Sequence, residues 1–161
     1  MTAPYDQHDL QREWARDDRT IASLRELIDT DGGFTFDPTR GTLIEIGSTK
    51  AYAIAVLGTE HVIRAGESFM ATVRALTRRH AVEIADRECV IGGWFSPQRG
   101  HAMIELTELF DVTRAQAIFI GRARQQDAVL DLATGECIDT SQPVRITSAG
   151  LLHTGVATWA A

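Results

Sequence analysis

Two stretches of this sequence share a pattern that constrains the fold. Residues 32–46 read GGFTFDPTRGTLIEI, and residues 92–106 read GGWFSPQRGHAMIEL. Each stretch places Pro-x-Arg-Gly between two strand-like apolar runs. Proline presets φ at the second position of a turn, and glycine supplies the positive φ that closes the turn. Both stretches are therefore predicted to form β-hairpins, which pair strands in an antiparallel sheet.

The shared pattern is either a repeated functional site or turn chemistry that the chain uses twice. Four residues separate Gly-Gly from proline in the first copy, and three separate them in the second. A shift of one residue turns side chains to the opposite face of a strand, which a duplicated site would tolerate poorly and a hairpin tip tolerates well. We therefore interpret the repeat as turn chemistry. An old duplication of a hairpin-plus-helix unit, spanning 32–85 and 92–126, is an intermediate interpretation.

Helical spacing of apolar residues predicts three helices, at 7–29, 68–85 and 114–126. Ser68 is a predicted N-cap, and Thr113 with Gln116 forms a predicted capping box. Gly121 inside the third helix indicates close packing on the sheet. The predicted strands are 34–36, 43–46, 52–57, 61–64, 89–95, 102–110, 128–132 and 136–138, with a turn at 57–60 and an extended tail at 144–146 and 151–158.

This order of elements favours the α+β class. Hairpins alternate with single helices, and no Pro-rich or Ser-rich linker interrupts them. We expect one compact domain over residues 1–161, mainly an antiparallel sheet of hairpins with three helices.

The sequence contains no recognisable catalytic or cofactor-binding motif. It has no phosphate-binding glycine loop, no His-Glu-x-x-His and no Cys-x-x-Cys. Its five histidines lack the spacing of metal ligands. We accordingly expect no cofactor and no metal site.

The best polar group of side chains lies on one predicted strand. His101, Glu105 and Thr107 alternate with apolar residues and should share a face, with Glu45 from the first hairpin beside them. His101 and Glu105 would lie about 13 Å apart, so they could flank a substrate but could not touch. We interpret this face as solvated. The alternative is a catalytic face with His101, Glu105 and Glu45 as its acid–base groups.

The hairpins also supply candidate binding residues: Trp94, Arg99 and Arg40. Trp94 is expected in the core or as an interface anchor, and the two arginines should point from exposed tips into solvent or to a partner. Strand alternation predicts that Glu45 and Glu105 are more exposed than their apolar neighbours. The neighbours predicted to be buried are Ile44, Ile46, Ile104 and Leu106.

Composition excludes some classes of function. A formal net charge of −6 disfavours general nucleic-acid binding, and no apolar run is long enough to span a membrane. Cys89 and Cys137 are expected to be reduced in a cytoplasmic protein. Fifteen of the sixteen basic residues are arginine and asparagine is absent, which indicates a genome rich in G and C.

Residues 92–136 resemble a segment of uncharacterised small proteins of actinobacteria and their phages and plasmids. The matching features are Gly-Gly-Trp with a Pro-containing hairpin at 92–100, a helix carrying Gly121-Arg122 and Gln126, and the closing run 131–136. No activity is established for the resembling proteins, so the resemblance implies an origin and transfers no site.

These observations favour a non-enzymatic accessory or protein-interaction domain. We expect it to self-associate or to dock on a protein partner through a sheet edge or an apolar patch. The alternative is a small enzyme acting on a phosphorylated or nucleotide substrate through the His101/Glu105 face, with nearby arginines as anion clamps. DNA mimicry ranks last, because the acidic residues are scattered along the chain.

Overall fold

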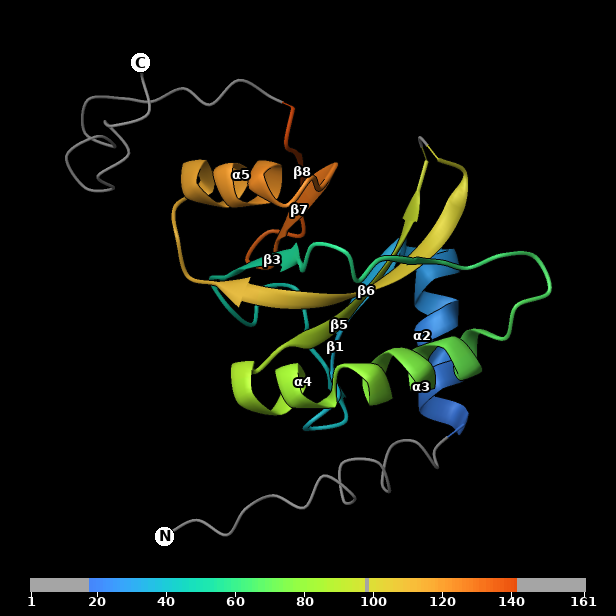
Figure 1. Cartoon of the computed structure of the whole chain (residues 1–161). Coiled ribbons are helices and arrows are strands. Elements are labelled where there is room, and N and C mark those ends of the chain that lie inside the picture. The colour runs from blue at the N-terminus through green and yellow to red at the C-terminus, as the bar shows by residue number, and fades with distance from the viewer. Residues whose placement is uncertain (1–17, 98, 142–161) are drawn as a thin grey trace, which may run out of the picture.

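The computed structural model describes residues 18–97 and 99–141 (Figure 1). Four helices and eight strands lie within these ranges. The helices are α2 (Asp18–Asp31), α3 (Phe69–Arg79), α4 (Ala81–Arg87) and α5 (Arg114–Ala123). The strands are β1 (Gly33–Asp37), β2 (Thr42–Leu43), β3 (Tyr52–Ala55), β4 (His61–Val62), β5 (Val90–Ser96), β6 (His101–Phe110), β7 (Ala128–Asp131) and β8 (Cys137–Asp139). The expected tail strands and the first part of the expected helix 7–29 lie outside the described residues.

The eight strands form one antiparallel sheet that curls into a half-barrel. Its order is β2-β1-β5-β6-β3-β7-β8, and β4 pairs with β6. Strands β5 and β6 form the central hairpin, in which Ser96 is opposite His101 and Val90 is opposite Thr107. The predicted α+β class and the antiparallel sheet are confirmed.

The described residues contain four helices where three were predicted, because the segment predicted as one helix at 68–85 divides at His80. Ser68 caps the first part by accepting a hydrogen bond from the Ala71 N–H group, as expected. The two parts pack against different parts of the sheet. Leu76 of α3 belongs to the cluster under α2, whereas Ile84 of α4 packs with Leu106. A straight helix could not follow the curled sheet to both places.

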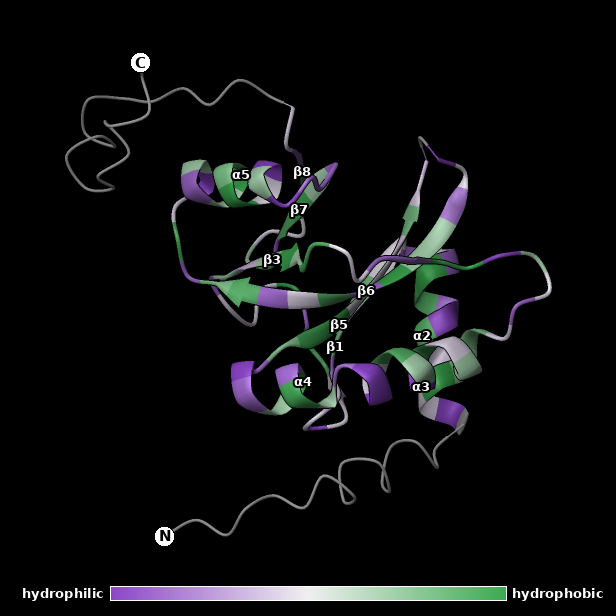
Figure 2. Ribbon diagram, viewed as in Figure 1, coloured by the Kyte–Doolittle hydropathy of each residue, from purple (hydrophilic) through white to green (hydrophobic). Residues whose placement is uncertain are grey.

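Among the described residues, the helices cover one face of the sheet. Helices α2 and α3 pack on β1, β5 and β6, and α5 packs on β3, β7 and β8. Gly121 of α5 permits this contact, since a Cβ there would lie 2.6 Å from a Val129 methyl group. Successive side chains of a strand point to opposite faces, so the central strand β6 also presents side chains to the other face. Figure 2 shows hydrophilic residues among the hydrophobic ones along this strand.

We call that other face the helix-free face, because its apolar cluster contains no helical residue. Ala53 and Leu130 belong to this cluster, and strand alternation places Glu105 and Met103 on the same side. Directly opposite residues of an antiparallel pair share a face, so Gly92 and Trp94 of β5 also lie there.

The predicted turn at 57–60 does not reverse the chain. Both β3 and β4 pair with β6, so they are two parts of one interrupted strand. The residues between them form an outward turn, in which Gly58 has φ +82°. Thr59 anchors this turn, since its hydroxyl accepts a hydrogen bond from the Leu106 N–H group at 3.1 Å.

The strand predicted at 43–46 ends early. Ile44 still donates a backbone hydrogen bond to Thr35, but the chain then turns, with the Ser48 N–H group bonded to the Glu45 carbonyl. Ile44 is consequently half-buried, and Ile46 is 53% exposed. The predicted burial of Ile46 is wrong, because the strand alternation that placed it inward stops before it.

None of the helices in the described ranges combines the length and the apolar character that crossing a membrane requires.

Candidate functional site

The two hairpin tips share one turn geometry, which a third loop also adopts. The Gly41 N–H group donates to the Asp37 carbonyl at 2.8 Å, and the Gly100 N–H group donates to the Ser96 carbonyl at 2.7 Å. Gly135 makes the same bond to Asp131 at 2.8 Å, and all three glycines have φ between 67° and 76°. The third loop contains neither proline nor arginine. This geometry supports the interpretation of the repeat as turn chemistry.

The paired glycines of the two copies have different roles. Gly32 has φ +83° and follows the end of α2, where a left-handed residue is favoured. Gly92 and Gly93 lie inside β5 instead. Because they lack a Cβ atom, each leaves room for a side chain from a neighbouring strand. A Cβ at Gly93 would lie 2.3 Å from the Phe34 ring on the helix-covered face. The repeat therefore does not reproduce a site.

Arg40 and Arg99 do not meet. Strand register places the β1–β2 tip at the Val90 end of β5, and the β5–β6 tip lies at the other end. The Arg40 side chain is 81% exposed and lies 3.6 Å from Asp37 of its own turn. Glu45 lies in an exposed loop tied to β7–β8 by the Gly47–Leu132 hydrogen bond, so it does not join the β6 residues.

Arg99 is bound within the chain, contrary to the expectation that it points to solvent or a partner. Its guanidinium lies 3.0 Å from Glu60 Oε1 and 2.8 Å from Asp127 Oδ2. These contacts connect the β5–β6 tip to the turn between β3 and β4 and to the start of β7. Arg99, whose positive charge acts on Glu105 of β6, is therefore already paired with two carboxylates.

Glu105 is buried, with 8% of its surface exposed, so the prediction of an exposed glutamate on a solvated face is wrong. The alternation itself is correct, since Ile104 and Leu106 face the helices and are buried as predicted. The difference arises because the curled sheet encloses its helix-free face as well. Met103, beside Glu105 on that face, is 0% exposed.

Burial changes the protonation of Glu105. Loss of solvation, followed by repulsion from the nearby Glu60 carboxylate, raises the pKa of Glu105 from 4.5 to about 8. A hydrogen bond from the half-buried Trp94 and the positive charge of Arg99 oppose that rise without cancelling it. At neutral pH the side chain is therefore mainly a neutral carboxylic acid, which can donate a hydrogen bond.

Three buried polar atoms on this face of β6 make no hydrogen bond within the described residues. They are His101 Nε2, Glu105 Oε2 and Thr107 Oγ1. Buried polar atoms in folded proteins almost always have a partner, and water or a ligand supplies the partner when the protein does not. We call His101, Glu105, Thr107 and Trp94 the β6 site.

Gly92 is the part of this site that the sequence pattern did not identify. A Cβ at this position would lie 2.6 Å from Thr107 Oγ1 and 3.7 Å from Glu105 Oε1. The two polar side chains therefore converge over the glycine. Its place in a Gly-Gly pair directly before Trp94 was visible in the sequence, but only the strand register shows what faces it.

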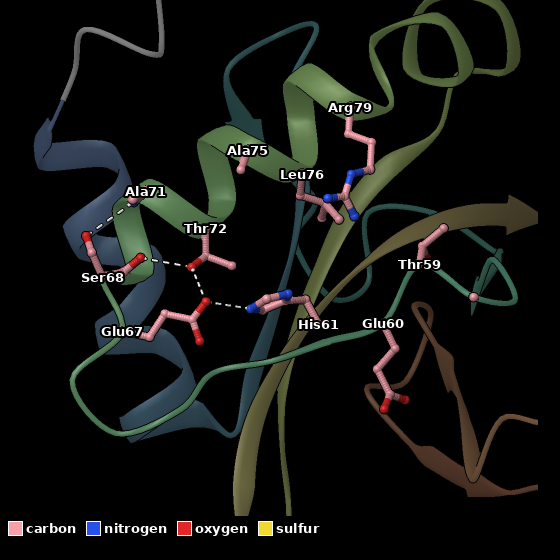
Figure 3. A pocket seen from close by; sticks show the side chains of 11 residues that line it. Thr59, Glu60, His61, Glu67, Ser68, Ala71, Thr72, Ala75, Leu76 and Arg79 are labelled. Atoms are coloured by element: carbon pink, nitrogen blue, oxygen red, sulfur yellow. Dashed lines mark hydrogen bonds and ion pairs between the residues drawn. The ribbon is translucent and has the colours of Figure 1, made fainter.

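A pocket on the helix-covered side contains a second polar group that the sequence analysis missed, a contact between His61 and Glu67 (Figure 3). Five residues separate them in the sequence, a spacing that matches no motif that we recognised. Within the part of the chain that the structure describes, no cluster of three or more potential metal ligands occurs.

No family model, curated protein or solved structure matches this chain.

Proposed function

We propose that the protein is a ligand-binding domain whose small-molecule ligand occupies the helix-free face of the sheet at the β6 site. The observation that carries this proposal is the set of three buried polar atoms without protein partners on one face of β6. Unsatisfied buried polar groups are often found at functional sites. A strongly raised pKa, such as that of Glu105, is also typical of functional sites.

The chemistry of the site favours a polar ligand that is uncharged or cationic. Neutral Glu105 can donate a hydrogen bond, and Thr107 and His101 can each donate or accept. Arg99 is occupied by Glu60 and Asp127, so it is not available as an anion clamp. A phosphorylated or nucleotide substrate is therefore disfavoured at this face.

Binding fits the geometry better than acid–base catalysis. Glu105 and His101 are four residues apart on one strand, which separates them by about 13 Å. They therefore cannot act as a hydrogen-bonded acid–base pair. The proposal accordingly keeps the non-enzymatic role that the sequence favours.

The test is an NMR titration with three probes: acetamide, guanidinium chloride and sodium phosphate. We expect acetamide or guanidinium to shift the backbone amides of 92–94 and 103–107 saturably, and phosphate to leave them unchanged. Glu105→Leu has a similar size without hydrogen-bonding atoms and should abolish the shifts, while Glu45→Leu, in the exposed loop, should retain them. Absence of a saturable shift with every probe, or equal loss in both variants, would overturn the proposal.

A second candidate function, self-association, is favoured by the edge of the sheet. Strand β2 lies at the end of the described strand order, and Leu43 on it is 43% exposed. An edge strand presents unpaired backbone groups that can pair with another copy, and with two residues β2 would form only a short contact of this kind. Light scattering across a hundredfold range of protein concentration should show a dimer that Leu43→Lys converts to a monomer. A wild-type protein that is monomeric throughout would contradict this candidate.

A further inference from the structure

The pocket beside α3 is separate from the β6 site. Its volume is about 320 Å³, and its walls are the turn at 58–60, His61, the segment Glu67–Ser68 and one side of α3. His61 is opposite Ile104 in the strand register, so it lies on the helix-covered face, whereas Glu105 lies on the other face. A ligand in this pocket would therefore use different residues from those of the β6 site.

His61 is held in place by a carboxylate that is itself fixed. Its Nε2 atom lies 2.6 Å from Glu67 Oε1. The Thr72 hydroxyl donates to the same oxygen at 3.2 Å, and the Arg64 N–H group donates to Glu67 Oε2 at 3.1 Å. These bonds, led by the one from Arg64 and followed by the one from His61, lower the pKa of Glu67. Glu67 therefore stays ionised and orients the imidazole.

This orientation leaves the second ring nitrogen of His61 for another partner. With Nε2 directed to Glu67, Nδ1 can accept a hydrogen bond when the ring is neutral and donate one when it is protonated. A protonated ring would therefore present an Nδ1–H donor from which an anion could accept a hydrogen bond.

Arg79 supplies a positive charge to the same pocket. Figure 3 shows its side chain extending from the end of α3 into the space above His61, while the Glu60 side chain points away. Arg79 makes no ion pair with another described residue, whereas Glu60 is engaged by Arg99. A guanidinium offers paired N–H donors that match the geometry of carboxylate and phosphate groups.

We propose that this pocket binds an oxyanion, a phosphate or carboxylate group, between the guanidinium of Arg79 and the protonated ring of His61. Glu67 is a positioning residue, because it acts on the anion only through His61. The inference does not depend on the ligand of the β6 site.

The experiment is a titration of the full chain with sodium phosphate and, separately, sodium acetate at pH 6.5 and constant ionic strength, observed through the ring resonances of His61. We expect a saturable shift toward the resonances of the protonated imidazolium. A response to phosphate alone would identify a phosphate site, and a response to acetate alone would identify a carboxylate site. No saturable shift with either anion would overturn the proposal.

Two arginine variants separate a specific site from general attraction of anions. Arg79→Gln should weaken binding at least tenfold. Arg78→Gln removes the same charge from the adjacent, exposed position of α3 that does not line the pocket, and it should change affinity less than twofold. Equal effects of the two variants, or an unchanged affinity in Arg79→Gln, would contradict the assignment. Thermal unfolding verifies that both variants are folded.

Discussion

At the scale of the residue, Gly92 is the position where we expect a single added methyl group to lower the stability of the fold. Its missing Cβ leaves the space into which Thr107 and Glu105 point, and a Cβ would lie 2.6 Å from the Thr107 hydroxyl oxygen. We expect Gly92→Ala to destabilise the fold by about 1–3 kcal/mol, as overpacking usually does. Chemical unfolding monitored by tryptophan fluorescence measures this cost.

A double-mutant cycle identifies the contact responsible. Thr107→Ala removes the oxygen that the new methyl group would meet, so the double variant should be more stable than the sum of the single effects predicts. Strictly additive effects would show that the strain at Gly92 has another source.

At the scale of the element, the two hairpin tips make a matched pair. Arg40 and Arg99 occupy the same place in the same turn, but Arg99 alone connects its hairpin to Glu60 and Asp127. We expect Arg40→Ala to change stability by less than about 0.5 kcal/mol. Arg99→Ala should cost about 1 kcal/mol, since partly exposed ion pairs are individually weak and this change breaks two of them. Urea unfolding compares the two variants.

The pKa of Glu105 provides an independent test of the Arg99 contacts. The positive charge of Arg99 lowers the pKa of Glu105, so Arg99→Ala should raise that pKa further, whereas Arg40→Ala should leave it unchanged. Carboxyl carbon resonances followed by NMR over a pH series report the value. Equal behaviour of the two variants would show that the Arg99 contacts do not act on the β6 site.

At the scale of the whole molecule, Glu105 should make stability fall as pH rises. Its folded pKa of about 8 exceeds its usual value of 4.5, so the folded state holds a proton that the unfolded state releases first. The contribution is fully present below pH 4.5 and is lost progressively up to pH 8. One pKa unit corresponds to about 1.4 kcal/mol, so the total loss should be a few kcal/mol.

Glu105→Gln is the control for this pH dependence, because it preserves a neutral side chain of nearly the same shape. Urea unfolding at pH 5, 7 and 9 should show a much flatter profile for the variant. The carboxylates with lowered pKa values, such as Glu67 and Glu136, act in the opposite direction, and their contribution is lost as pH falls through the acidic range. An equal decline in wild type and variant would exclude Glu105 as the cause.

The features that depend on neighbours along the chain could be predicted from the sequence. The turns that end at Gly41 and Gly100, the cap at Ser68 and the capping box at Thr113 are all as predicted. Each depends on backbone conformations and hydrogen bonds within about five residues, which local residue types control. Strand alternation likewise placed His101, Glu105 and Thr107 on one face of β6.

The folded chain was needed to show what covers each face of the sheet and which distant side chains meet. Alternation identifies the side on which Glu105 lies, but its burial depends on the curl of the whole sheet and on Gly92 opposite it. The bonds of Arg99 to Glu60 and Asp127 join segments that are far apart in the chain. Such contacts depend on strand order and register, so they cannot be predicted from the spacing of residues within any one segment.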